Sequence, residues 1–397
     1  MDPVTNPFVP GAGTPPPELV GREQLLEKSR IALSRIQRGN PAKSLIIVGL
    51  RGVGKTVLLV SIEDLAKTLG FKTIMIEAPE GKSLAQLLIS HLRQVLFSLD
   101  AMAHIGHKAK RALNVLRSFA NGLKLSIGDV DLGISISAEK GIADSGDLEA
   151  DLSALLGCVG EAAKEAQTAL LICIDELQYL SPADFSALIM SIHRINQLGL
   201  PLILIGAGLP QILGLAGNAK SYAERLFDYP SVGALPLNEA IEAIQGPARL
   251  EGIAFTQEAL QEIFNQTQGY PYFLQQWGYE AWNLAQSSPI GIETIHKATQ
   301  AAIQSLDESF FKVRFDRCTP SEKRYLKALA DLGSGAHRSG DVADQMNDKV
   351  STVAPTRSKL IKKGMIYSPQ HGDTEFTVPM FDQYLKRIMD SPPPAKQ

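Results

Sequence analysis

Short runs of Ile, Leu and Val alternate with longer helical patterns between Ser44 and about Leu235. Strands of this kind, separated by helices, are typical of βαβ units, in which helices cover both faces of a parallel sheet. We therefore expect an α/β domain with a parallel sheet over this part of the chain. The predicted strands, each expected to be buried on both faces, are residues 44–48, 72–76, 169–174 and 202–205.

The pattern differs on either side of this region. Residues 236–312 are helical in pattern throughout, and residues 313–390 predict three short helices, a hairpin around His371 and Gly372, and a final helix. That order is typical of a winged helix-turn-helix. Gly364 is expected to end the third helix, and Pro355 to lie near its first turn, where the missing N–H costs little. The predicted domains are a Pro/Gly-rich arm (1–20), an α/β domain (21–235), an all-helical domain (236–312) and a winged helix (313–390).

Two further segments interrupt these domains. The first, at about residues 100–147, contains a basic helical stretch followed by GDVDLGISIS. We expect this segment to be an insertion that includes a hairpin. The terminal SPPPAKQ is expected to be disordered.

Composition narrows the classes of protein. The 397 residues are 45% hydrophobic and 20% charged, as in soluble globular proteins. The net charge of -3 gives no general argument for nucleic acid, so any basic surface must be local. An apolar stretch at 198–217 contains two prolines and five glycines, which favour a buried strand and loop over a membrane span.

Cysteine and histidine usage points to a reduced compartment without a metal cluster. Cys158, Cys173 and Cys318 lie far apart in sequence, and Cys173 falls inside a predicted strand, where it is expected to be a buried thiol. The seven histidines show no metal-ligand spacing. No apolar run typical of a signal peptide opens the chain. We therefore expect a cytoplasmic protein with no membrane partner.

The strongest motif is GLRGVGKT, which follows the strand at 44–48 and precedes a helical pattern. Glycines allow the backbone to fold around phosphates, and the following helix N-terminus favours negative charge. Lys55 would reach the β- and γ-phosphates, and the Thr56 hydroxyl would hold Mg²⁺. The predicted cofactor contacts of this loop are Gly49, Leu50, Arg51, Gly52, Val53, Gly54, Lys55, Thr56 and Val57.

A second motif, ALLICIDELQYL, places two acidic residues at the end of a buried strand. Ligands of open α/β sheets bind at such carboxyl ends. Asp175 is the expected metal partner, and Glu176 is placed to act as general base on an attacking water. We therefore predict ATP and Mg²⁺ as cofactors and ATP hydrolysis as the reaction.

Four segments together resemble the AAA+ superfamily of P-loop ATPases: PPELVGREQLLE, GLRGVGKT, LLICIDELQYL and GYPYFLQ. Within it, the chain is most similar to bacterial origin-recognition-like ATP-binding proteins with a C-terminal winged helix, and it resembles the STAND signalling NTPases. The resemblance extends from about Asn6 to Arg387. It implies a helical lid domain and further nucleotide contacts: Val20, Gly21 and Arg22 on the adenine side, and Gly269 and Pro271 in the lid.

The chain also departs from that family. The strand LILIGAGLP ends in Gly206, Ala207 and Gly208, where a polar sensor of the γ-phosphate is expected, and GYPYFLQ lacks the usual lid arginine. Because such groups stabilise charge in the transition state, we expect slow or partner-stimulated hydrolysis.

One arginine is a candidate for catalysis in trans. Arg225 follows the fourth strand at about the place where the superfamily presents an arginine finger to a neighbouring subunit, which implies a nucleotide-dependent homo-oligomer. Alternatively, Arg225 is a surface residue paired with Glu224 or Asp228. His193 and Arg194 are weaker candidates for the finger.

The third predicted helix of the winged helix carries four cations without an acidic residue. Arg357, Lys359, Lys362 and Lys363 would suit contact with double-stranded DNA, whereas the predicted wing is acidic. Two functions therefore remain open. The first is an ATP-dependent switch acting on DNA; the second is a STAND-like regulatory NTPase whose output is a protein partner.

Overall fold

The computed structural model describes residues 1–11, 13–14, 16, 19–102, 107–123 and 138–389. Its centre is a parallel five-stranded sheet in the order β2-β3-β4-β1-β5. β1 lies between β4 and β5, with Ile47 opposite Ala207 and Ser44 opposite Phe227. The strands are β1 (Ser44–Val48), β2 (Lys72–Glu77), β3 (Leu170–Asp175), β4 (Leu202–Gly208) and β5 (Phe227–Asp228).

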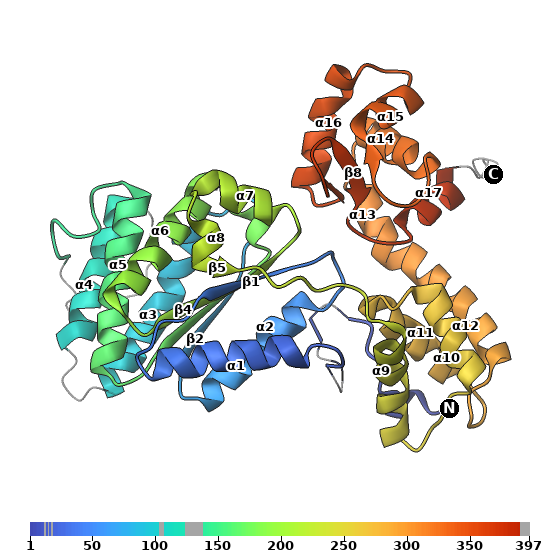
Figure 1. Cartoon of the computed structure of the whole chain (residues 1–397), viewed down its shortest axis with the longest axis horizontal. Helices are drawn as coiled ribbons and strands as arrows, with labels where there is room; N and C mark the ends of the chain where they lie inside the picture. The colour runs from blue at the N-terminus through green and yellow to red at the C-terminus, as the bar shows by residue number, and fades with distance from the viewer. Residues whose placement is uncertain (12, 15, 17–18, 103–106, 124–137, 390–397) are drawn as a thin grey trace, which may run out of the picture.

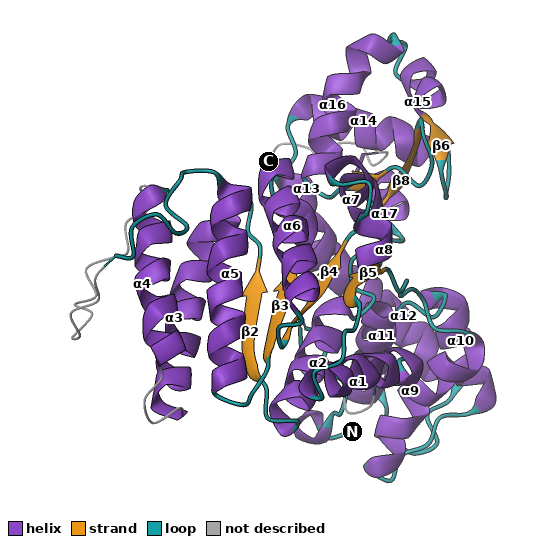
Figure 2. Cartoon of the chain, turned by 60° about the vertical axis from the view of Figure 1, so that its left-hand side comes forward, coloured by secondary structure: helices purple, strands orange, loops and turns teal. Residues whose placement is uncertain are grey.

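Helices cover both faces of this sheet (Figures 1 and 2). Alternate residues of β1 face opposite sides: Leu45 and Ile47 belong to the apolar core under α1 and α2, and Ile46 and Val48 to the core under the other helices. This agrees with the predicted α/β class. The helices are α1 (Glu23–Gln37), α2 (Lys55–Thr68), α3 (Leu84–Met102), α4 (His107–Gly122), α5 (Leu148–Glu165), α6 (Pro182–Leu198), α7 (Ile212–Ala219) and α8 (Ala223–Leu226).

The four strands predicted from sequence are all present, but β2 is not buried on both faces as expected. β2 is an edge strand. Ile74 and Ile76 are buried, whereas Thr73 and Met75 on the opposite face are half-buried and Glu77 is exposed. The apolar run could not reveal that the strand lies at the edge of the sheet. Cys173, in β3, is fully buried, as predicted.

The region after the sheet is helical, as predicted, and forms a separate bundle (Figure 1). The Pro/Gly-rich arm packs against it: the Phe8 ring is 1% exposed and lies against Gly278 and Phe255. A π-helical turn, Leu306–Phe311, continues the last helix of the bundle toward the C-terminal module. The bundle helices are α9 (Leu237–Leu250), α10 (Gln257–Thr267), α11 (Pro271–Leu284) and α12 (Ile292–Ser305), and α13 (Lys312–Asp316) follows the π-helical turn.

The C-terminal module contains the three helices, the hairpin and the final helix expected there, and a short additional strand. Thr319 caps its first helix with a capping box. Pro355 lies in the second turn of α16, further into the helix than predicted, on its exposed side. The elements are α14 (Pro320–Asp331), β6 (His337–Arg338), α15 (Ser339–Gln345), α16 (Val350–Lys362), β7 (Ile366–Tyr367), β8 (Asp373–Phe376) and α17 (Phe381–Met389).

Two predictions fall outside the described residues. GDVDLGISIS, with its expected hairpin, occupies residues 128–137, and SPPPAKQ occupies residues 391–397. The basic stretch before the first of these forms the amphipathic helix α4, whose apolar side packs on α3 and α5.

Candidate nucleotide-binding site

The GLRGVGKT segment forms the turn between β1 and α2, as its spacing predicts. Gly52 and Gly54 have φ values of 79° and 90°, a left-handed conformation that favours glycine. Gly49 lies so close to the Val232 carbonyl that a Cβ atom would come within 2.4 Å of it. The backbone therefore curls tightly at the N-terminus of α2, where its N–H groups suit an anion.

Lys55, the first residue of α2, is only 7% exposed. Its Nζ donates to the Leu50 carbonyl across the loop, at 2.7 Å. Burial lowers the pKa of Lys55 to about 8, an effect that the nearby Glu176 and Asp175 carboxylates oppose. The ammonium group is thus held inside the loop, next to where phosphate oxygens would bind.

Thr56 and Asp175 meet at the carboxyl end of β3. The Thr56 hydroxyl donates to Asp175 Oδ2 at 2.5 Å, and the Glu176 N–H donates to Asp175 Oδ1 at 2.7 Å. Burial raises the pKa of Asp175, and the Thr56 hydrogen bond opposes the rise. A hydroxyl and a carboxylate at this edge are ligands of the kind that Mg²⁺ prefers.

Glu176 has a positive φ of 55°, which turns its side chain out of the line of β3. Its carboxylate accepts from Arg51 Nη1 at 3.4 Å and from the Gln178 side-chain amide. Glu176 also lines the cavity in front of the phosphate loop. The predicted base and the predicted loop therefore face one another.

Gln178 occupies the space beside the end of β4, and sequence reasoning missed it. Its Oε1 accepts from the Leu209 N–H at 3.0 Å while its amide holds Glu176. A Cβ atom at Gly208 would lie 3.0 Å from Gln178 Oε1, and one at Gly206 would lie 2.3 Å from Leu177. The glycines that end β4 thus make room for the segment after Glu176.

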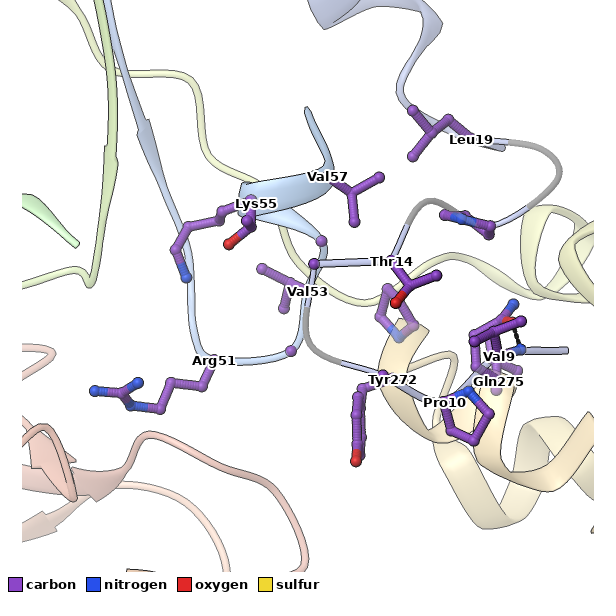
Figure 3. Close-up of a pocket in the computed structure, with 18 of the residues that line it drawn as sticks. Val9, Pro10, Thr14, Leu19, Arg51, Val53, Lys55, Val57, Tyr272 and Gln275 are labelled. Atoms are coloured by element: carbon purple, nitrogen blue, oxygen red, sulfur yellow. Dashed lines mark hydrogen bonds between the residues drawn. The ribbon is translucent and has the colours of Figure 1, made fainter. Parts of the chain in front are cut away.

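The cavity in front of the loop, of about 260 Å³, lies between the α/β domain and the helical bundle (Figure 3). Of the residues implied by the family resemblance, Val20, Arg22 and Pro271 line it. Gly21 and Gly269 do not line it. A Cβ atom at Gly21 would collide with the Glu239 side chain, and one at Gly269 would collide with the Leu235 carbonyl. The loop residues that line the cavity are Arg51, Gly52, Val53, Gly54, Lys55, Thr56 and Val57.

The arm supplies part of this cavity wall, which the sequence did not predict. Val9, Pro10 and Thr14 lie around the cavity together with Tyr272 of α11 (Figure 3). The Val9 N–H donates to Gln275 Oε1 at 3.1 Å, which fixes the arm to α11. The low-complexity composition of the arm gave no indication of this role.

The phosphate loop also contacts the C-terminal module. The Arg51 N–H donates to the Thr377 carbonyl at 3.3 Å, and Arg51 Nε donates to the Gly364 carbonyl at 3.3 Å. Arg51 Nη2 donates to the Tyr179 hydroxyl at 2.5 Å. A second cavity, of about 380 Å³, separates the α/β domain from the module beside these contacts.

Arg225 does not belong to this cavity. It is exposed on α8, just before β5, and β5 pairs with the first residues of β1, at the end of the strand away from the phosphate loop. Asp228, one of its alternative partners, is paired with Lys28 at 2.9 Å and Lys43 at 3.4 Å. Arg194, the weaker candidate, is exposed on α6.

The four cations predicted for α16 are in two different situations. Arg357 bonds the Thr374 hydroxyl at 2.7 Å and the Asp373 carbonyl at 2.6 Å, and so braces α16 against β8. Lys363 Nζ lies 2.7 Å from Glu322 Oε2. The remaining two, Lys359 and Lys362, are exposed.

Metal-binding clusters and membrane-spanning helices are both absent from the described part of the chain. No cluster of three or more His, Cys, Asp or Glu residues capable of holding a metal ion occurs there. Among the described helices, none has the length and apolar character needed to cross a bilayer.

Comparison with known proteins gives a family for the α/β region. Residues 18–205 match the model described as "AAA ATPase domain", and residues 308–385 match "Domain of unknown function (DUF8462)". No curated protein matches the sequence.

Solved structures resemble the whole chain at low identity. A Walker-type ATPase of Pyrococcus abyssi is 15% identical, with 94% of this chain and 97% of that chain covered and a TM-score of 0.60. The Aeropyrum pernix ORC1 protein in complex with DNA is 14% identical, with 94% of each chain covered and a TM-score of 0.49. At these identities the likeness concerns the fold alone. The family match over residues 18–205, together with the geometry of the loop, identifies the α/β region as an ATPase domain of the AAA+ P-loop family.

Proposed function

We propose that the chain binds ATP with Mg²⁺ at the phosphate loop and acts as a nucleotide-dependent switch with slow or partner-stimulated hydrolysis. The observation that carries this proposal is the position of Arg51. Its guanidinium donates both to the Glu176 carboxylate and to the Gly364 carbonyl of the C-terminal module. Because Arg51 belongs to the loop that would wrap the phosphates, bound nucleotide would affect both contacts together.

The donor set fits a magnesium nucleotide better than a metal held by protein alone. Thr56 and Asp175 offer one hydroxyl and one carboxylate at the mouth of the loop. Mg²⁺ usually takes one or two protein ligands and completes its shell with water and phosphate oxygens. Thr56 would hold the ion, Asp175 would hold Thr56 or water bound to the ion, and the ion would neutralise charge on the phosphates.

Glu176 is placed to accept a proton from an attacking water, but its carboxylate already has two donors. Arg51 donates to Oε1 and Gln178 donates to Oε2, so an attacking water would compete with a donor at each oxygen of the carboxylate. Water attack would therefore be slow until Arg51 or Gln178 moves away. This supports hydrolysis that depends on a conformational change or on a partner.

The first experiment separates binding from hydrolysis. Lys55→Ala should weaken ATP and ADP binding about 100-fold, since losing a buried charge-assisted contact costs about 3 kcal/mol. Glu176→Gln should keep the affinity and abolish phosphate release. Both are measured with a fluorescent nucleotide and a phosphate assay. Unchanged turnover in Glu176→Gln would remove Glu176 as the base, and turnover of tens per second in the isolated wild-type monomer would contradict slow hydrolysis.

For the output of the switch, we propose DNA contact through the C-terminal module. Its order, α14-β6-α15-α16-β7-β8 with an antiparallel β6-β8-β7 sheet, supports a winged helix-turn-helix. Lys359 and Lys362 project from α16 without a buried role, and phosphate contacts of this kind give salt-dependent affinity.

Fluorescence anisotropy with duplex DNA tests this output. Lys359→Ala combined with Lys362→Ala should reduce the affinity and lower the slope of log affinity against log salt by about two, because two phosphate contacts are lost. Lys164→Ala, at the far end of α5, serves as a matched control for loss of a surface cation. Absence of salt-sensitive binding by the wild type would reject DNA as the partner.

A protein partner is the second candidate, and the contacts of the module favour it. Arg357 and Lys363 bond to Thr374 and Glu322 within the module and so do not form part of a free basic face. The edge of the module at Gly364 and Thr377 rests on the phosphate loop. A module released from this position would expose that edge to another protein, as in a STAND-like switch.

We further propose that Arg225 acts in trans in a nucleotide-dependent homo-oligomer. It is exposed and lies away from the cavity of its own chain, so any nucleotide that it reaches would be bound by a neighbour.

A further inference from the structure

Arg314, on α13, is a half-buried arginine that none of the motifs accounts for. It lines both the cavity in front of the phosphate loop and the second cavity beside the C-terminal module. Its Nη1 donates to the Phe310 carbonyl at 2.6 Å, and its guanidinium lies 3.8 Å from the centre of the Phe310 ring. Among the described residues, no carboxylate forms an ion pair with it.

The charge around Arg314 is unbalanced. Burial and the neighbouring Arg51 guanidinium lower the pKa of Arg314 to about 10, so that it still carries its charge at neutral pH. Arg51 itself is paired with Glu176. Three guanidinium groups (Arg22, Arg51 and Arg314), one ammonium (Lys55) and one carboxylate (Glu176) thus line the cavity, where an anion would relieve the repulsion.

A series of contacts through Tyr272 and Phe310 connects Arg314 to the phosphate loop. The Tyr272 N–H donates to the Gly52 carbonyl at 3.1 Å. The Tyr272 ring stacks on Phe310 with centroids 4.5 Å apart, and Arg314 lies over the Phe310 ring. Phe310 belongs to the π-helical turn before α13, an irregularity that often marks functional positions.

We propose that Arg314 contacts the terminal phosphate of bound ATP and is the residue that distinguishes ATP from ADP; this rests on nucleotide binding at the phosphate loop. The group comes from the segment that joins the helical bundle to the C-terminal module. Its contact with the γ-phosphate would therefore pull that segment toward the loop. Loss of the γ-phosphate would release it and leave Arg314 without a counter-ion.

The test compares affinities for Mg²⁺-ADP and for a Mg²⁺-bound, non-hydrolysable ATP analogue. Arg314→Met keeps an apolar stem over Phe310 and removes the cation. It should weaken binding of the ATP analogue about 10- to 100-fold, as expected for loss of a charge-assisted bond, and change ADP affinity less than about threefold. Arg317→Met is the matched control: Arg317 lines only the second cavity and pairs with Glu80 at the surface, and both affinities should stay as in the wild type.

Retained ADP affinity also shows that the variant is folded. If Arg314→Met does not fold, Arg314→Lys is the deciding variant, because it keeps the aliphatic stem and the charge but has a shorter reach. Its affinity for the ATP analogue should fall about 3- to 10-fold, and its affinity for ADP should not change. Equal weakening of both nucleotides, or no weakening of either, would overturn the role of Arg314. Failure of the wild type to bind any nucleotide would instead refute the proposed function.

Discussion

At the scale of single residues, Lys55 is the group whose protonation the proposed nucleotide would affect most directly. Burial lowers its pKa to about 8, well below the ordinary 10.5. Phosphate oxygens favour the ammonium form, so binding would raise that pKa again. Nucleotide binding is therefore linked to proton uptake by Lys55 at pH values above about 8.

This linkage gives a pH dependence with a definite sign. Without nucleotide, the Lys55 side chain is protonated below about pH 8 and neutral above it. Because binding would then require uptake of a proton, nucleotide affinity should fall by up to about tenfold per pH unit as the pH rises from 8 to 10. Titration calorimetry in buffers of different ionisation enthalpy would measure both the affinity and the proton uptake. Lys55→Ala provides the comparison, since its weak residual binding should lack this trend. Equal wild-type affinity at pH 7.5 and 9.5 would contradict the linkage.

Residues in the two motifs were predictable because each motif fixes both chemistry and position. Lys55, Thr56, Asp175 and Glu176 come together in the structure as their spacing requires. Gln178 was not predictable in the same way, because the DELQYL sequence does not indicate that the Gln178 amide lies beside the end of β4. That contact depends on how the chain turns after β3.

At the scale of elements, the end of β4 gives a direct test of packing. A Cβ atom at Gly206 would lie 2.3 Å from Leu177 Cδ1. Gly206→Ala should therefore lower the free energy of unfolding by about 1–3 kcal/mol, the usual cost of overpacking. Gly157→Ala, in α5 with open space at its Cβ, should instead stabilise by about 1 kcal/mol through helix propensity. Urea unfolding measures both, and a neutral Gly206→Ala would show that the β4 end is not tightly packed.

The N-terminal arm is the element for which sequence reasoning was least informative. Its prolines and glycines predicted no regular structure, and the described residues contain only the short turn Pro3–Thr5. Its place was decided by distant partners: Phe8 fills the space that Gly278 leaves open, and Val9 bonds Gln275. Long-range contacts of irregular backbone leave no periodic pattern in a sequence, whereas strands and helices do.

At the scale of the whole molecule, the phosphate loop is the point where the parts meet. The helical bundle reaches it through Tyr272 and the Gly52 carbonyl, and the C-terminal module through Thr377 and the Arg51 N–H. The order of strands and helices along the chain followed from changes in its hydrophobic pattern. The docking of the bundle and the module on the loop did not, because it rests on single hydrogen bonds between segments far apart in sequence.

We propose that the phosphate state of the nucleotide is transmitted from this loop to the C-terminal module. Hydrogen exchange of the full-length Glu176→Gln chain, compared with ATP, with ADP and without nucleotide, tests it most directly. We expect exchange at the Arg51 amide, whose N–H donates to Thr377, and at the amides of residues 361–377 to differ between the ATP and ADP states. Nucleotide that binds and protects the loop while leaving residues 361–377 identical in both states would contradict the account.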